Sequence, residues 1–467
     1  MSSTVSRLSR LARAACLGLL LASSASALAA EARKPNVLVI LSDDVGWGEF
    51  GFQGEKQIPT PNIDSIAASG VRFTQGYVSG PYCSPTRAGL LTGRYQTRFG
   101  HENNRVATVA GLPLTEKTIA DRLRAVGYDT LAVGKWHLGL APEYRPTARG
   151  FDEFYGTLAN TPFFHPTNFV DSRISNDVRP VPENDFYTTD AYAERIVDWL
   201  GRRTDKPWFI YLPFNAQHAP LQATKKYLDR FPNIEDDRRK TFAAMMSAMD
   251  DAVGRVLGKI RDLGQEEDTL IVFLSDNGGP TASTTSKNGP LHGFKATTWE
   301  GGVRVPFAMQ WKGKIPAGKV YDHPIIQLDV LATAVAAAGI TPDASWKLDG
   351  VDLVPYLTGA KTGKPHETLY WRFAKQWAVR HGDWKLVVAN GGSGKPELYD
   401  LANDLSETKD LAAEKPEKLA ELQAIYDRWN AEQAEPITPI EAPGAAKTKK
   451  GATKKKGAAK KKKAGDD

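Results

Sequence analysis

Two pairs of oxygen-bearing side chains each come directly after an apolar run of the kind that forms a buried strand. The four residues are Asp43, Asp44, Asp276 and Asn277. In a parallel sheet the carboxyl ends of the strands meet at one edge, where ligands bind. A set of carboxylate and amide oxygens, with no thiolate or imidazole among them, suits Ca²⁺ better than Zn²⁺. The alternative is that these residues only form turns or helix caps, as Asp and Asn commonly do.

Cys83 is the only cysteine left once an amino-terminal export signal is set aside, so no disulfide can form within the chain. A free cysteine is most often a buried, inert residue. The neighbours of Cys83 are Ser84, Pro85 and Thr86, which do not resemble a core strand. Arg87 lies four residues on, where a following helix would bring its charge back toward the cysteine. This pattern favours a chemical role for the cysteine over a packing role.

Further cations and imidazoles stand at other points of the chain. Lys135 and His137 are two residues apart, so both would lie on one face of an extended segment. His218 follows an apolar run, and Lys295 precedes the segment Ala296 to Gly302. Cations that converge on one cleft would stabilise negative charge that develops on a bound anion. A single Lys or His of this kind is more often a structural or solvated surface group.

The segment from Cys83 to Arg94 resembles the signature of the type I sulfatases, in which the cysteine of a Cys-x-Pro-x-Arg core is oxidised to formylglycine. Similar matches recur from Pro35-Asn36 to Leu398-Tyr399-Asp400 and Asn403. The chain therefore resembles an arylsulfatase-like, formylglycine-dependent enzyme with the fold of the alkaline phosphatase superfamily. In that family one hydroxyl of the hydrated aldehyde attacks sulfur, and the other later expels sulfate and restores the aldehyde.

The resemblance also implies a role for each candidate residue. One calcium ion per subunit would be held by Asp43, Asp44, Asp276 and Asn277 together with the modified Cys83. Arg87 and Lys135 would stabilise the diol, and His137 would help to deprotonate it. His218 would contact the sulfate and protonate the leaving alcohol, and Lys295 would bind the sulfate. Ala296 and Trp299 depart from the Gly and Tyr that other members often carry, but neither supplies a functional group.

Substrate-binding residues are harder to predict, because loops vary most within a family. Five polar residues could line the cleft or could equally be ordinary surface. They are His101, Asn103, Asn104, His165 and Arg372.

The elements that would position these residues alternate along the chain. Apolar runs at 36–41, 130–133, 208–212 and 269–274 predict strands, and apolar spacing predicts helices at 115–126, 190–199 and 236–263. This alternation is typical of an α/β domain with a mostly parallel central sheet flanked by helices. Runs at 369–373, 377–380 and 384–388, with turns between them, predict a smaller antiparallel sheet with a closing helix at 416–429.

The two ends of the chain differ from its middle. Residues 1–30 combine three arginines, a short apolar run and small residues, which predicts a cleaved signal peptide and a secreted or periplasmic protein. The catalytic domain would span 34–348 and the smaller domain 349–436. The tail 437–467 contains ten lysines and no aromatic residue, so we expect it to be disordered and able to contact an anionic surface or polymer. The net charge of +6 comes from these ends and does not indicate nucleic-acid binding.

The sequence thus predicts a sulfuric ester hydrolase that acts on a sulfated carbohydrate or an aryl sulfate outside the cell. Its expected partners are a formylglycine-generating maturation enzyme and the export machinery. Two alternatives stay open: a phosphodiester or phosphonate monoester hydrolase of the same fold, and a non-catalytic binder of anionic polymer that works through the lysine-rich tail.

Overall fold

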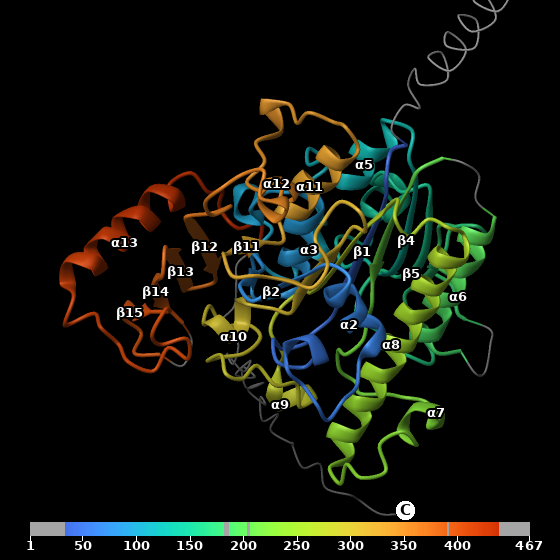
Figure 1. Ribbon diagram of the computed structural model, residues 1–467, viewed down its shortest axis with the longest axis horizontal. Coiled ribbons are helices and arrows are strands. Elements are labelled where there is room, and N and C mark those ends of the chain that lie inside the picture. The colour runs from blue at the N-terminus through green and yellow to red at the C-terminus, as the bar shows by residue number, and fades with distance from the viewer. Residues whose placement is uncertain (1–32, 182–185, 203–205, 390–391, 439–467) are drawn as a thin grey trace, which may run out of the picture.

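The computed structural model describes residues 33–181, 186–202, 206–389 and 392–438. The predicted signal peptide and residues 439–467 of the predicted tail lie outside this range. A nine-stranded sheet forms the centre of the molecule (Figure 1). In sheet order its strands are β10 (Lys319–Tyr321), β2 (Val71–Phe73), β9 (Phe307–Gln310), β8 (Thr269–Ser275), β1 (Asn36–Ser42), β7 (Trp208–Pro213), β4 (Asp129–Lys135), β5 (Glu153–Thr157) and β6 (Phe169–Asp171).

The five central strands, from β8 to β5, run parallel to one another. Antiparallel pairing occurs only toward the edges, between β8 and β9, β9 and β2, and β5 and β6. All seven residues of β1 are buried, as expected for a strand covered on both faces. The predicted α/β class with a mostly parallel central sheet is confirmed.

Helices cover both faces of the sheet. One core contains Leu38 and Ile40 of β1 with residues of α2 (Pro61–Ala68), α6 (Thr188–Gly201), α7 (Lys225–Leu228) and α8 (Asp237–Asp262). The other contains Val37 and Val39 with residues of α3 (Cys83–Thr92), α5 (Ile119–Arg124), α11 (Asp329–Ala337) and α12 (Val354–Thr358). Successive β1 side chains therefore enter opposite cores, which fixes the register of the strand.

Two of the long predicted helices illustrate how caps set the boundaries. The Asp236 side chain accepts a hydrogen bond from the Arg239 backbone, so α8 begins where the sequence predicts, and its methionines are buried in the core. The helix predicted from residue 115 begins later, at Ile119. Thr118 and Asp121 form a reciprocal capping box there, which fixes the start of α5.

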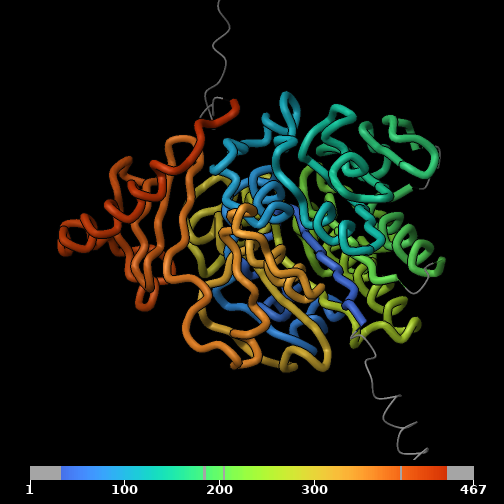
Figure 2. Tube along the Cα trace, turned by 90° about the horizontal axis from the view of Figure 1, so that it is seen from above, coloured from blue at the N-terminus to red at the C-terminus, as the bar shows by residue number. Residues whose placement is uncertain are grey.

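A second, antiparallel sheet follows near the C-terminus, and Figure 2 shows it with α13 as a lobe at one end of the molecule. Its strands are β12 (Thr368–Phe373), β13 (Gln376–His381), β14 (Trp384–Val388) and β15 (Glu397–Asp400), and α13 spans Pro416–Asn430. Helix and sheet join through aromatic rings: Tyr370 stacks on Trp429 at 4.8 Å between ring centroids. The predicted antiparallel sheet and closing helix are confirmed.

Other short elements include β3 (Gly76–Tyr77) and β11 (Ile325–Ile326), which pair with each other, and the single-turn helices α4 (Val106–Val109), α9 (Thr281–Thr284) and α10 (Glu300–Val303). Among the described residues, none of the helices combines the length and the apolar character needed to cross a membrane.

Candidate active site

The two predicted pairs of oxygen-bearing side chains meet at the carboxyl edge of the central sheet. Strands β1 and β8 are parallel neighbours, with Ser42 opposite Ser275, so the residues that follow them leave the sheet at the same level. Asp44 has a left-handed backbone (φ 67°), and its amide donates a 3.1 Å hydrogen bond to Asp276 Oδ1. All five predicted metal-binding residues, the four oxygen-bearing side chains and Cys83, are buried. The register of two strands thus brings together residues more than 230 positions apart.

These residues form an acidic cluster that could hold a metal ion. Ligand atoms of Asp43, Asp44, Cys83 and Asp276 all lie within 4.8 Å of one another. Asn277 donates its amide N–H to Asp44 Oδ1 at 2.8 Å, but its own Oδ1 is buried and accepts no hydrogen bond from any described residue. A buried oxygen without a donor beside three carboxylates fits a hard cation such as Ca²⁺.

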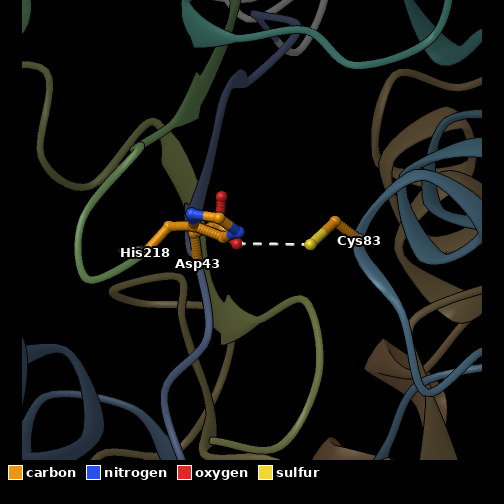
Figure 3. A group of neighbouring side chains, drawn as sticks. All are labelled: Asp43, Cys83 and His218. Carbon is orange, nitrogen blue, oxygen red and sulfur yellow. Dashed lines mark hydrogen bonds between the residues drawn. The ribbon is translucent and has the colours of Figure 1, made fainter. Parts of the chain in front are cut away.

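Cys83 is the first residue of α3, and its sulfur lies 3.4 Å from Asp43 Oδ1 (Figure 3). The residue is fully buried, and every residue of α3 is buried with it. Burial raises the pKa of the Cys83 thiol far above its ordinary value, and the negative charge of Asp43 is the second cause of this rise. An unmodified Cys83 is therefore a protonated thiol at neutral pH, which is a poor nucleophile and a poor metal ligand.

Arg87 and Lys135 are fully buried and form ion pairs with the carboxylates. Arg87 Nη2 lies 2.8 Å from Asp276 Oδ2 and 3.3 Å from Asp43 Oδ2, and its Nη1 donates to the Lys135 carbonyl at 2.7 Å. Lys135, the last residue of β4, contacts Asp43 through its ammonium group. Burial opposes ionisation of Asp43, but Lys135 and Arg87 outweigh it and hold the pKa of that carboxyl well below its usual range. Asp43 is therefore ionised.

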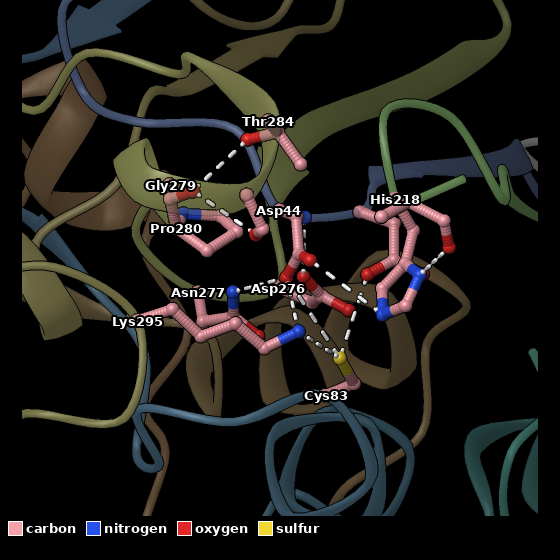
Figure 4. A network of polar contacts seen from close by, with 12 residues as sticks. Asp44, Cys83, His218, Asp276, Asn277, Gly279, Pro280, Thr284 and Lys295 are labelled. Carbon is pink, nitrogen blue, oxygen red and sulfur yellow. Dashed lines mark hydrogen bonds and ion pairs between the residues drawn. The ribbon is translucent and has the colours of Figure 1, made fainter. Parts of the chain in front are cut away.

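Lys295 and His218 complete the cluster from two further segments, as Figure 4 shows. Lys295 Nζ lies 2.6 Å from Asp44 Oδ1 and 3.3 Å from Cys83 Sγ. His218 Nε2 lies 3.6 Å from Asp44 Oδ2, while its Nδ1 is 2.5 Å from the Ala219 carbonyl. Their side chains are 10% and 20% exposed, whereas those of Asp43, Arg87 and Lys135 are fully covered. Lys295 and His218 are therefore the side chains of this group that reach solvent.

His137 stands two residues after β4 ends. Its backbone is left-handed (φ 59°), its side chain is almost fully buried, and its Nδ1 has no partner among the described residues. Burial, and then the charges of Lys135 and Arg87, lowers the pKa of His137 well below its ordinary value. A neutral imidazole with an unpaired nitrogen can accept a proton from a neighbouring group.

The predicted substrate-binding residues are not brought together in the same way. His101 is fully buried, with Nε2 at 2.6 Å from Ser84 Oγ, and Asn104 Oδ1 accepts from the Ser84 amide at 2.9 Å. Both residues therefore support the start of α3 from behind. Asn103 bonds to Thr438 near the end of the described chain.

Arg372 and His165 are placed among other residues of the described chain. The Arg372 guanidinium forms an ion pair with Glu102, which is 1% exposed, and Nη1 donates to Asn430 Oδ1 at 2.9 Å. These contacts tie β12 to the segment that follows α3 and to α13. His165 is exposed and lines a surface pocket with Arg179.

Asn160 is a candidate site residue that the sequence reasoning missed. It is exposed, and its Nδ2 lies 3.3 Å from His218 Nε2. It stands in the loop that follows β5 at the carboxyl edge of the sheet. Its position after a parallel strand is the signal that could have indicated it, although β5 itself was not predicted.

The chain belongs to the sulfatase family. The family model described as "Sulfatase" matches residues 35–340, and a second one, "N-sulphoglucosamine sulphohydrolase, C-terminal", matches residues 292–432. The dog (Canis lupus familiaris) protein N-acetylgalactosamine-6-sulfatase is 34% identical over 79% of this chain and 74% of its own. Human (Homo sapiens) arylsulfatase A is 33% identical over 85% of this chain and 88% of its own.

Solved structures agree with this assignment. The crystal structure of Ps i-CgsB in complex with k-i-k-neocarrahexaose superposes with a TM-score of 0.80 and 34% identity, over 88% of this chain and 95% of that one. The phosphonate monoester hydrolase of Agrobacterium radiobacter superposes with a TM-score of 0.62 and 21% identity, over 84% and 96%. The second likeness concerns the fold alone. The chain is therefore an enzyme of the sulfatase class, with the fold predicted for it.

Proposed function

We propose that this enzyme hydrolyses sulfate esters through a formylglycine formed from Cys83 and with one bound calcium ion. The observation that carries the proposal is the buried cluster itself, in which Cys83 lies within reach of three carboxylates and of Lys295. A thiol with a strongly raised pKa has little use there as a nucleophile, whereas a hydrated aldehyde at the same position would contribute hydroxyl groups.

Calcium would bind to Asp43, Asp44, Asp276 and Asn277, and when bound it would supply a fixed positive charge next to the sulfate oxygens. Lys295 and His218, the two partly exposed side chains, would receive the sulfate group from solvent. The charge of Lys295 and hydrogen bonds from both side chains would hold the anion in line with residue 83.

Proton transfer would be divided between two histidines. His218, on the open side, would protonate the alcohol that leaves as the bond between sulfur and the ester oxygen breaks. His137, on the buried side, would accept a proton from the diol of residue 83 before sulfate is released. Arg87 and Lys135 would keep the diol oriented, because their own positions are fixed by Asp276 and Asp43.

The substrate class that we propose is a sulfated sugar or polysaccharide. The relatives named above include an N-acetylgalactosamine-6-sulfatase, and one solved structure contains a neocarrahexaose. We further propose that the protein is exported by its amino-terminal segment, is modified by a maturation enzyme, and contacts anionic polymer through its lysine-rich tail.

The test begins with the mass of the peptide that contains Cys83, taken from protein produced in a host with a formylglycine-generating enzyme. We expect exchange of sulfur for oxygen and loss of two hydrogens. Hydrolysis of 4-nitrophenyl sulfate should then fall to background in Cys83→Ala and after calcium chelation, and should return when calcium is added back.

A phosphonate monoester and a phosphodiester serve as competing substrates in the same assay. Hydrolysis of either at a higher kcat/KM than the sulfate ester would replace the sulfatase proposal with the alternative activity. An unmodified thiol in exported protein with no turnover of any ester would remove the enzymatic proposal altogether.

A further inference from the structure

The turn between β12 and β13 brings the C-terminal sheet to the rim of the active site. Phe373, the last residue of β12, stacks on Tyr82 with ring centroids 5.4 Å apart. Gln376, the first residue of β13, donates from Nε2 to the Ala296 carbonyl at 2.9 Å. Tyr82 precedes Cys83 and Ala296 follows Lys295, so both ends of this turn touch neighbours of the central cluster.

The contacts along β12 show which way the strand points. Trp371 Nε1 donates to the Val78 carbonyl at 2.7 Å, and two residues later Phe373 reaches Tyr82. The strand therefore runs toward Cys83. Phe373 pairs with Gln376, so Ala374 and Lys375 form a two-residue turn beyond them, with Ala374 in a left-handed conformation (φ 56°). This turn is therefore flanked on both sides by contacts with the residues next to Cys83 and Lys295.

Lys375 is the exposed residue of this turn, and it forms no ion pair with any of the described residues. Its charge is available at the rim. Arg87, Lys135 and Lys295, three cations of the central cluster, are each already paired with a carboxylate of that cluster. An anionic group outside the central cluster would therefore depend on rim cations for attraction.

We propose that Lys375 binds a second anionic group of the substrate while the first sulfate ester occupies the centre. The inference rests on the proposed function and narrows it to substrates that carry at least two anionic groups, such as oligosaccharides sulfated on successive sugar units. A flexible ammonium on an exposed turn suits this role, because it can follow anions at slightly different positions. The exposed contact will be weakened by salt.

The test compares Lys375→Gln with wild-type enzyme on a disaccharide that carries two sulfate groups and on 4-nitrophenyl sulfate, which carries one. A unit-charge contact at an exposed site corresponds to about a fivefold change in kcat/KM at low ionic strength. We expect that loss for the disaccharide, mainly through KM, and no change for the aryl sulfate. Lys375→Arg should retain most of the activity, and the loss should shrink in 0.5 M salt.

Lys364→Gln is the matched control, since Lys364 is an exposed lysine that precedes β12 in the same domain. This substitution should leave kcat/KM unchanged for both substrates. Equal kcat/KM for wild type and Lys375→Gln on the disulfated disaccharide would overturn the inference, as would an equal loss on both substrates. If the wild-type enzyme hydrolyses neither sulfate ester, the proposed function has failed, and this outcome is distinct from active enzyme that ignores Lys375.

Discussion

Lys385 offers a sharp test of how the C-terminal domain supports the active-site segment. Its ammonium lies 2.9 Å from Glu300 Oε1 and 2.8 Å from Glu407 Oε1, and both contacts are fully covered. Glu300 begins α10, five residues after Lys295, and its amide donates to Glu407 Oε2 at 2.7 Å. The substitution Lys385→Met keeps most of the side-chain volume but leaves two buried carboxylates without this counter-charge.

Removing one partner of a buried ion pair costs about 3–5 kcal/mol of unfolding free energy. The pH dependence follows from Glu407. Burial raises its pKa, and the opposing effect of Lys385 does not restore the ordinary value. A raised folded-state pKa means that stability is greatest below the ordinary pKa of the carboxyl and is lost as pH rises through the folded value. Without Lys385, stability should fall more steeply as the pH rises and Glu407 ionises. The cost of Lys385→Met in unfolding free energy should therefore be complete at pH 8 and smaller at pH 5.

Urea unfolding at pH 5 and pH 8 measures both values for wild type and Lys385→Met. Lys409→Met is the control, because the pair between Lys409 and Glu414 is 66% and 57% exposed and should contribute less than about 1 kcal/mol. A cost below about 1 kcal/mol for Lys385→Met at pH 8, or a cost that increases toward pH 5, would refute the reasoning.

Three further predictions use other parts of the chain. Burial lowers the pKa of His101 from 6.5 to about 3. The unfolding free energy of the wild type should therefore fall by about 4–5 kcal/mol as the pH drops through this interval. Unfolding curves in acid should show a weaker pH dependence for His101→Gln. Gly278→Ala should abolish sulfate ester hydrolysis, because the new Cβ would lie 1.7 Å from the Gly301 carbonyl oxygen. Gly258 has open space around it, so Gly258→Ala should leave activity unchanged and raise the melting temperature. Arg372→Met should lower the free energy of urea unfolding by about 3–5 kcal/mol, because buried Glu102 loses its partner. The KM for 4-nitrophenyl sulfate should stay constant. A raised KM in a stable variant would show that Arg372 binds substrate.

Much of the fold could be predicted because the central strands carry a strong signal. The strands β1, β4, β7 and β8 are almost entirely buried, and their central residues are therefore mostly apolar. The edge strands are harder to predict. β2, β6 and β10 have three residues each, and β9 has four, which is too few to show a period.

The candidate site divides in a similar way. Asp43 and Asp276 could be placed together from sequence because each follows a long central strand, and the parallel register of β1 and β8 then brings their neighbours level. His101 could not be placed, because its burial against Ser84 depends on how α3 packs. Asn160 and Gln376 depend on loop paths and on contact between two domains, and neither leaves a periodic pattern in the sequence.

The pairing of buried charges in the site affects every experiment in which one of these charged residues is substituted. Arg87, Lys135 and Asp43 are fully buried, and each depends on an opposite charge within about one hydrogen-bond length. A substitution of any one of them leaves an uncompensated charge, so it will lower stability as well as activity. Lost hydrolysis in such a variant cannot by itself assign a catalytic role. Lys375 stands on an exposed turn and forms no ion pair with the described residues, so at this position activity can be separated from folding.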